Sequence, residues 1–193
     1  LQQGVPEKGG INGMEEWNDV YDAQRCRTGK THLRGTPWEP GEYGLTVCVW
    51  VYDGRGKILL TRRAPEKSFA GTWENSGGMA RAGEDSLTAI QRELWEETGI
   101  AAPPERFEFL GSDQDRNTFY DFYCLKNPVS LKKIRLQPGE TDGVMWAGFG
   151  KIHWMIRRGK ICRIIARQFY RQEKDLRSRN MPKKRAPFLD DLK

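Results

Sequence analysis

The chain has 193 residues, 37% of them hydrophobic and 11% aromatic, which is enough for one domain of ordinary size with a buried core. This composition excludes a fibrous or largely disordered protein. No stretch approaches the roughly 20 consecutive apolar residues of a membrane-spanning helix, and the N-terminus shows neither the basic start nor the apolar run of a signal peptide. We therefore expect a soluble, cytoplasmic protein that does not engage a membrane.

The positive charge of the protein is concentrated near its C-terminal end. The formal net charge is +6, but residues 1–150 carry 18 basic and 22 acidic side chains, whereas residues 151–193 carry 14 basic and 4 acidic ones. A basic segment of this kind is one way of binding nucleic acid. However, apolar residues recur at helical spacing through the same segment, which favours a packed helix with a basic outer face. Nucleic acid is therefore a disfavoured partner.

Composition divides the chain into three segments. Residues 1–13 are rich in glycine and polar residues without periodicity, which is typical of a tag remnant or a disordered leader. Residues 14–179 are predicted to form a single domain, and residues 180–193 a basic tail.

Runs of β-branched and aromatic residues mark the predicted strands. Residues 44–52 (GLTVCVWVY) and 57–62 (KILLTR) flank an Asp-Gly-Arg-Gly turn, which predicts a β-hairpin. Further strands are expected at residues 107–112, 118–125 and 144–147. Because helical patterns occur between and after these strands, the domain is predicted to belong to the mixed α/β class.

Three helices are predicted. The first covers residues 86–98, where leucine and isoleucine recur at helical spacing, with Ser86 as the expected N-terminal cap and Gly99 at the expected end. After the last strand, apolar residues predict a short helix around residues 152–156 and a longer one that begins near residue 161.

The predicted helix at residues 86–98 carries a row of carboxylates. Glu93, Glu96 and Glu97 project from one side of it, at about 100° per residue. Its apolar positions centre roughly a quarter turn away, so the helix can pack on a sheet and still hold its acids at the edge of a cleft. Three carboxylates on one face repel one another unless a cation lies among them, and all-oxygen ligation suits Mg²⁺ or Mn²⁺. A solvated acidic face is the alternative interpretation.

The residues around this helix follow a longer pattern. The stretch from Gly78 reads GMARAGEDSLTAIQRELWEETGI, with Glu84 after five residues and Arg92-Glu93-Leu94-Trp95-Glu96-Glu97-Thr98-Gly99-Ile100 after seven more. It resembles the Nudix hydrolases and matches every specified position of the Nudix box. The resemblance implies an α/β/α sandwich with a mixed β-sheet, and hydrolysis of nucleoside diphosphates linked to another group. It also decides against the solvated-face interpretation.

The resemblance further implies roles for individual residues. The implied metal ligands are Glu96, Glu97, Glu93, Glu84 and the backbone carbonyl of Gly78. Glu93 can also help to deprotonate the attacking water and Arg92 can hold a neighbouring carboxylate, so Glu93, Arg92 and Glu97 form the predicted catalytic set. The implied cofactor is Mg²⁺, with Mn²⁺ as a substitute. Such cations fit the chemistry, because a diphosphate resists water until its negative charge is screened and a water is activated.

Outside the box, the chain is similar to the Nudix branch that resembles isopentenyl-diphosphate isomerase. The similarity runs from about Trp17 to about Phe149 and includes Trp17-Asn18-Asp19-Val20-Tyr21-Asp22, Thr28-Gly29 and Arg34-Gly35. The isomerase needs a cysteine just before the box as a proton donor or acceptor, whereas this chain has Trp73-Glu74-Asn75-Ser76-Gly77-Gly78 there. The missing cysteine favours hydrolysis over isomerisation.

Five residues outside the box helix are candidates for substrate contacts. Arg62, Arg63 and Lys67 follow a predicted strand and can point cationic groups at a diphosphate. Trp73 is a candidate for stacking on a base or lining a lipid-tail pocket, and Glu140 lies in a loop where some relatives keep another catalytic acid. The alternative interpretations are an exposed basic turn, a core tryptophan and an ordinary polar loop.

The favoured function is therefore a Mg²⁺-dependent hydrolase of a diphosphate linkage in a nucleoside diphosphate derivative or a related organic diphosphate. The expected partner is this small molecule, and a homodimer is compatible with the sequence. An activity like that of isopentenyl-diphosphate isomerase is the first alternative. A nucleic-acid-binding or regulatory role of the basic C-terminal segment is the second.

Overall fold

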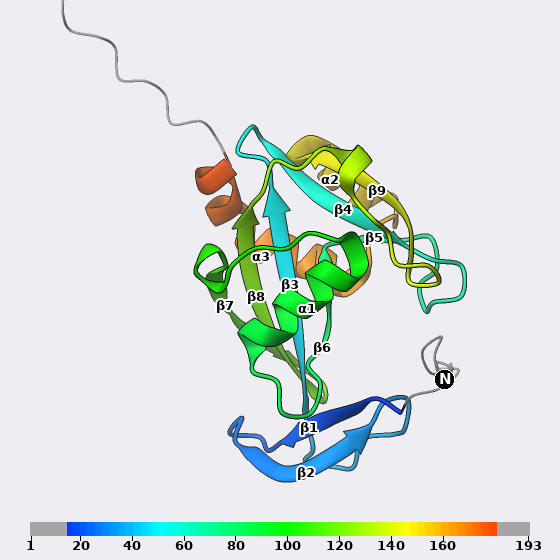
Figure 1. The fold of residues 1–193 in the computed structure, drawn as a ribbon, viewed down its shortest axis with the longest axis vertical. Coiled ribbons are helices and arrows are strands. Elements are labelled where there is room, and N and C mark those ends of the chain that lie inside the picture. Colours follow the sequence, from blue (N-terminus) through cyan, green and yellow to red (C-terminus); the bar gives the residue numbers. More distant parts are fainter. Residues whose placement is uncertain (1–14, 181–193) are drawn as a thin grey trace, which may run out of the picture.

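The computed structural model describes residues 15–180 of the chain (Figure 1). The predicted leader, residues 1–13, and the predicted tail beyond Asn180 lie outside the described residues. Asn180, predicted as the first residue of that tail, is the last residue of a helix. Within the described range, none of the helices combines the length and the apolar character needed to span a bilayer.

A mixed sheet forms the centre of the described part. Its seven strands are β3 (Gly44–Tyr52), β4 (Lys57–Arg63), β5 (Trp73–Glu74), β6 (Ser76–Met79), β7 (Glu108–Asp115), β8 (Thr118–Lys126) and β9 (Thr141–Gly148). The main order is β5-β4-β3-β8-β7, with β6 also paired to β3 and β9 to β4. The pair β3 and β8 is parallel, and the other pairs are antiparallel. The predicted mixed sheet is confirmed.

Helices cover both faces of this sheet (Figure 1). The elements are α1 (Ser86–Thr98) on one face, and α2 (Phe149–Arg157) and α3 (Arg163–Asn180) on the other. Successive side chains of a strand point to opposite faces. The valines of β3 accordingly pack with α1, whereas Trp50 and Tyr52 of the same strand pack with α2 and α3. The result is the predicted α/β/α sandwich.

A separate two-stranded sheet precedes the central one. It consists of β1 (Trp17–Tyr21) and β2 (Arg27–Leu33), which pair antiparallel. Reciprocal backbone hydrogen bonds of 2.8 and 2.9 Å between Tyr21 and Tyr43 join it to the chain just before β3. The sequence does not predict this hairpin, because β2 is mostly polar and exposed and lacks a hydrophobic alternation. Two short 3₁₀ turns, η1 (Pro104–Arg106) and η2 (Leu131–Lys133), lie in the loops.

The ends of α1 agree only in part with the sequence prediction. Asp85, not Ser86, is the N-terminal cap, and its side chain accepts a hydrogen bond from the backbone N–H of Thr88 at 2.7 Å. Ser86 is the first helical residue, and its hydroxyl accepts a hydrogen bond from the Tyr123 hydroxyl. Gly99 ends the helix as predicted, in the left-handed conformation with a φ of 70°.

Two strands extend three residues beyond a predicted end. β7 continues to Asp115 instead of ending at residue 112, and β9 begins at Thr141 instead of residue 144. Both extensions are paired, to β8 and to β4 respectively. They are polar, so a hydrophobic pattern could not reveal them.

Candidate active site

One guanidinium gathers the carboxylates of α1. Arg92 contacts Glu84 at two points, from Nε to Oε1 at 2.7 Å and from Nη2 to Oε2 at 2.9 Å. Its Nη1 donates to Glu93 Oε1 at 2.8 Å and to Glu96 Oε2 at 3.1 Å, and its Nη2 also donates to the Met79 carbonyl at 3.1 Å. Burial lowers the pKa of Arg92, but its contacts with Glu84 and Glu93 outweigh this and raise the pKa overall. Arg92 is therefore a permanent cation at the centre of the acid face.

Glu84 reaches this cation from the loop between β6 and α1. Its Oε2 also accepts a hydrogen bond from the backbone N–H of Arg81 at 2.9 Å. Burial raises the pKa of Glu84, but the hydrogen bonds from Arg92 and Arg81 hold the pKa below its ordinary value. The Arg81 side chain in turn lies 3.3 Å from Glu96 Oε1. The loop is thus tied to the helix at both ends of the acid face.

The β1–β2 hairpin supports the same loop from the other side. The Asn18 side chain donates to the Ala80 carbonyl at 2.8 Å, and Asp19 Oδ2 accepts from the backbone N–H of Gly83 at 2.9 Å. The backbone N–H of Ala82 also donates to the carbonyl of Trp17 at 2.8 Å. The hairpin therefore positions the loop that presents Glu84.

Gly78 lies directly beneath the Glu93 carboxylate. The ladder of β6 and β3 pairs it with Val47. A Cβ added at Gly78 would lie 2.5 Å from the carboxyl carbon of Glu93, so any side chain here would displace that carboxylate. Burial raises the pKa of Glu93, and the charge of Arg92 offsets only part of this increase. Glycine therefore allows a carboxylate to approach the strand backbone closely.

Glu97 is the most buried acid of α1, with 8% of the residue exposed. Its Oε2 is buried and has no hydrogen-bond partner among residues 15–180. Burial raises the pKa of Glu97 well above its ordinary value, and the charges of Glu93 and Glu74 raise it further. A buried carboxylate that faces other carboxylates is unstable unless a proton or a cation neutralises it.

A second group of charges adjoins Glu97. Arg63 Nη1 contacts both carboxylate oxygens of Glu74, at 2.9 and 3.0 Å, and Lys67 Nζ lies 2.7 Å from Glu140 Oε2. Burial raises the pKa of Glu74 in spite of Arg63. The sequence does not single out Glu74, because a two-residue strand is too short to show alternation. Its place just before the box is the only signal that could have found it.

Arg62 and Trp73 lie on the other face of the sheet. They are directly paired between β4 and β5, so they share one face while Arg63 and Glu74 take the opposite one. The Arg62 guanidinium lies 5.7 Å from the centre of the Trp73 ring, and its Nε donates to Asp142 Oδ1 at 2.6 Å. Trp73 packs against the core formed with α2 and α3. Strand alternation thus turns these two predicted substrate residues away from the carboxylates.

The donors of the acid face suit a hard divalent cation. Across residues 15–180, no three His, Cys, Asp or Glu side chains are already arranged as a ligand group, and Arg92 donates hydrogen bonds to Glu93 and Glu96. Even so, Glu97 offers a buried oxygen without a partner, and Glu93 lies against the Gly78 backbone. All of these donors are oxygens, the ligands that Mg²⁺ and Mn²⁺ prefer.

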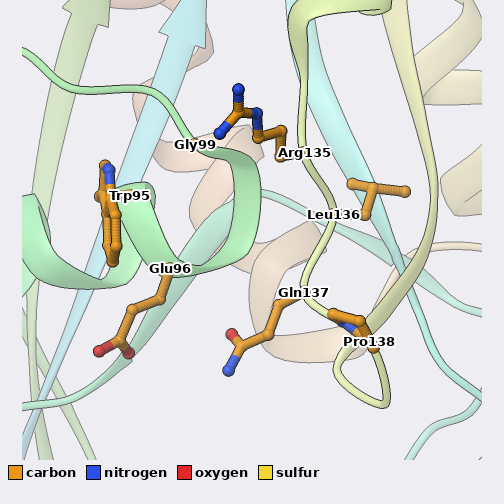
Figure 2. Close-up of a pocket in the computed structure, with 7 residues that line it drawn as sticks. All are labelled: Trp95, Glu96, Gly99, Arg135, Leu136, Gln137 and Pro138. Carbon is orange, nitrogen blue, oxygen red and sulfur yellow. The ribbon is translucent and has the colours of Figure 1, made fainter.

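An open pocket of about 350 Å³ borders the same helix (Figure 2). It is lined by Trp95, Glu96 and Gly99 of α1 and its end, and by Arg135, Leu136, Gln137 and Pro138 of the facing loop. Glu96 therefore borders both this pocket and the Arg92 network. The sequence does not predict the pocket, because the loop has no regular pattern. Trp95, a large apolar residue away from the helix's apolar positions, is the one signal.

Comparisons with known proteins agree with this architecture. The family model for the NUDIX domain matches residues 42–163. An uncharacterized Nudix hydrolase of Listeria monocytogenes is 33% identical over 130 residues, which are 66% of this chain and 76% of that protein. An isopentenyl-diphosphate Delta-isomerase of Halorhodospira halophila is 33% identical over 99 residues, which are 49% of this chain and 57% of that protein. The crystal structure of a Deinococcus radiodurans protein has the same fold, with a TM-score of 0.69 at 21% identity over 81% of this chain and 98% of that chain.

Proposed function

Since the chain belongs to the Nudix family of hydrolases, we propose that it cleaves a diphosphate linkage in a nucleoside diphosphate derivative or a related organic diphosphate. The reaction depends on Mg²⁺, for which Mn²⁺ can substitute. The observation that carries the proposal is the Glu97 carboxylate, which is buried beside Glu93 and has an oxygen without a partner among the described residues. A divalent cation bound here would neutralise this charge and give the unpartnered oxygen a ligand bond.

The carboxylates of Glu93, Glu96, Glu97 and Glu84 and the Gly78 carbonyl would hold the metal. When bound there, Mg²⁺ or Mn²⁺ would screen the charge of the diphosphate and activate the attacking water. Arg92 keeps Glu84, Glu93 and Glu96 oriented through its hydrogen bonds. Its charge remains in place when protons move, because its pKa is raised.

Glu93 is the residue that accepts the proton of the attacking water. Burial raises the pKa of Glu93 above its ordinary value, which makes it a stronger base than an exposed glutamate. The water oxygen bonds to phosphorus while the bond from phosphorus to the bridging oxygen breaks. The bridging oxygen leaves on the second phosphate group, so both products are phosphates.

Arg63 and Lys67 are the cations that contact the substrate. Each is paired with a carboxylate beside Glu97, with Glu74 and Glu140 respectively. Phosphate oxygens can replace these carboxylates as hydrogen-bond acceptors. Glu140 would then lose its ion pair with Lys67.

A substrate screen tests the proposal. The protein is incubated with nucleoside diphosphate sugars, dinucleotides, nucleoside triphosphates and prenyl diphosphates in ¹⁸O-labelled water, with Mg²⁺, Mn²⁺ or EDTA. We expect a metal-dependent product in which one phosphate group carries the label, and its position identifies the bond that breaks. A folded, metal-loaded protein that cleaves no member of these classes contradicts the proposal.

Isomerisation of isopentenyl diphosphate is the alternative, favoured by the similarity to the Halorhodospira halophila isomerase. The proton-transferring cysteine is missing next to Gly77. Cys48 pairs with Gly77 across the ladder, but it is buried on the α2 and α3 face, and burial raises the pKa of its thiol. In deuterated water we expect neither a dimethylallyl product nor carbon-bound deuterium. Deuterium incorporation at a useful rate would establish the alternative.

A further inference from the structure

We propose that the pocket between α1 and the loop of residues 135–138 binds the nucleobase of the substrate, with Trp95 as the stacking platform and Arg135 and Gln137 as the polar contacts. This inference rests on the proposed function, since it assigns the group that is attached to the diphosphate. It narrows the substrate class to compounds with a planar, hydrogen-bonding ring and disfavours prenyl diphosphates.

The pocket is held open by backbone contacts. The backbone N–H of Arg135 donates to the carbonyl of Thr98 at 2.9 Å, which ties the loop to the end of α1. A Cβ added at Gly99 would lie 3.3 Å from Cβ of Arg135, so the loop packs closely over the helix end. Binding a ring here therefore does not first require ordering of the loop.

Three polar groups in the pocket are free to bind a ligand. The indole N–H of Trp95, the guanidinium of Arg135 and the carboxamide of Gln137 form no hydrogen bond or ion pair with any residue in the described range 15–180. The cations predicted from the sequence differ in this respect, because Arg62 and Lys67 are each paired with a carboxylate. The pocket arginine is therefore available without breaking an ion pair.

Trp95 presents its ring to solvent. The residue is 60% exposed, whereas Ile90 and Leu94 of the same helix are buried in the core. Figure 2 shows its ring beside Glu96 on the helix, with the Gln137 side chain extending from the facing loop. An exposed indole next to unpaired donors and acceptors is suited to stacking on a base and reading its edge.

Glu96 connects this pocket to the acid face. Its carboxylate accepts a hydrogen bond from Arg92 and also lines the pocket. A diphosphate held at the acid face therefore places its next substituent beside Trp95. A prenyl chain would leave the guanidinium and the carboxamide without partners, whereas a nucleobase supplies acceptors and donors for both.

Equilibrium binding by calorimetry in the presence of Mg²⁺ tests the proposal, with ADP, inorganic diphosphate and isopentenyl diphosphate as probes. Trp95→Ala should weaken ADP binding by about tenfold or more, which corresponds to the loss of one base stack. The affinity for inorganic diphosphate, which has no ring, should not change. Arg135→Gln should weaken ADP binding by several-fold and act in the same direction.

Three further variants separate the alternatives. Trp95→Phe keeps an aromatic face and should restore most of the ADP affinity, whereas Trp95→Leu keeps only apolar volume and should not. Trp154→Ala is the matched control, because Trp154 is a 49% exposed tryptophan on α2, on the opposite face of the sheet. It should bind ADP like the unmodified protein.

Several outcomes would overturn the assignment. These are an unmodified protein that does not bind ADP, an equal ADP affinity before and after Trp95→Ala, or rescue by Trp95→Leu that equals rescue by Trp95→Phe. Loss of isopentenyl diphosphate binding in Trp95→Ala without loss of ADP binding would assign the pocket to a prenyl chain instead. Because binding is measured separately from turnover, ADP binding that depends on Trp95, together with no cleavage of any compound in the substrate screen, would refute the proposed function alone.

Discussion

Two charge-rich helices, α1 and α3, lie on opposite faces of one sheet and use their charges differently. On α3, acids and bases form local pairs, Glu173 with Arg177 and Asp175 with Arg179, on a surface that is partly exposed to solvent. On α1, Arg92 pairs with Glu93 and Glu96 of the helix and with Glu84 of the preceding loop, and Glu97 is buried with no cation paired to it among residues 15–180. Uncompensated negative charge therefore accumulates on α1, whereas each acid of α3 has a cation on the same helix.

This difference shows that the number of charges on a helix does not indicate its role. Surface ion pairs contribute little to stability because water screens them, and α3 is held by its buried apolar side instead. Arg167, Arg171 and Arg179 of α3 also have acidic partners on other elements. Phosphates would have to displace these acids, which weakens the nucleic-acid alternative. A buried surplus of one sign, as on α1, points to a ligand of the other sign.

The largest effect is expected when the uncompensated acid of α1 is neutralised. Glu97→Gln keeps the size of the side chain but removes one charge from the proposed metal site, so turnover should fall by at least ~10²-fold. Glu173→Gln makes the same change on α3 and should leave turnover unaltered. Steady-state kinetics with Mg²⁺ checks both variants, and near-normal turnover of a folded Glu97→Gln protein would refute the assignment of Glu97.

The second comparison removes one cation from each helix. Arg92→Gln leaves Glu84 and Glu93 partly buried without their partner and should lower the free energy of unfolding by about 2–4 kcal/mol. Arg171→Gln on α3 should cost less than about 1 kcal/mol, because its side chain is half exposed. Urea denaturation without metal measures both values. If both variants lost a similar amount of unfolding free energy, Arg92 would be no more important for stability than a surface arginine of α3.

A pair of glycines sharpens the comparison further. Gly78→Ala places a methyl group where the Glu93 carboxylate lies, so we expect turnover to fall by roughly tenfold or more while the fold persists. Gly150→Ala in α2 meets no atom within 4 Å and should raise stability by up to about 1 kcal/mol. If Gly78→Ala kept full activity, the close approach of Glu93 to the strand would be dispensable.

The pH dependence of stability should have opposite signs for the two helices. The pKa of Glu97 is raised from 4.5, so the folded protein loses stability as the pH rises above that value, and Glu97→Gln should stabilise the metal-free protein at pH 7. Burial raises the pKa of Glu173, but His153 and Arg177 outweigh this and lower it. Glu173→Gln should therefore destabilise at pH 7 by less than about 1 kcal/mol.

The stability changes caused by Glu97→Gln and by Glu173→Gln should both disappear at acidic pH, for different reasons. Below pH 4.5 the unfolded chain also protonates Glu97, so the gain from its substitution fades. As the pH falls through the lowered folded-state pKa of Glu173, the stabilising charge of Glu173 is lost in the unmodified protein as well. Thermal unfolding of both variants and the unmodified protein from pH 3 to pH 8 in EDTA checks these two predictions. If both substitutions stabilised the protein at pH 7, or both destabilised it, the proposed difference between Glu97 and Glu173 would be contradicted.

The sequence predicts those helices and strands along which one kind of residue recurs at a regular spacing. The valines of β3 and the acids of α1 recur at fixed periods, so the central strands and the box helix could be located from the sequence. Glu74 and the pocket could not, because each depends on residues from different elements brought together by folding. The opposite faces of Arg62 and Arg63 depend on the register of β4 with β5, which the sequence does not specify.

The hairpin of β1 and β2 determines which N-terminal residues the functional domain needs. The match to the family model starts at residue 42, yet Trp17, Asn18 and Asp19 form hydrogen bonds that hold the loop carrying Glu84. A fragment that begins at residue 42 would keep every residue of the box. It would lose the hairpin that positions the loop with Glu84. Anyone who shortens this domain or transplants it into a fusion protein should therefore retain the chain from Trp17 onward.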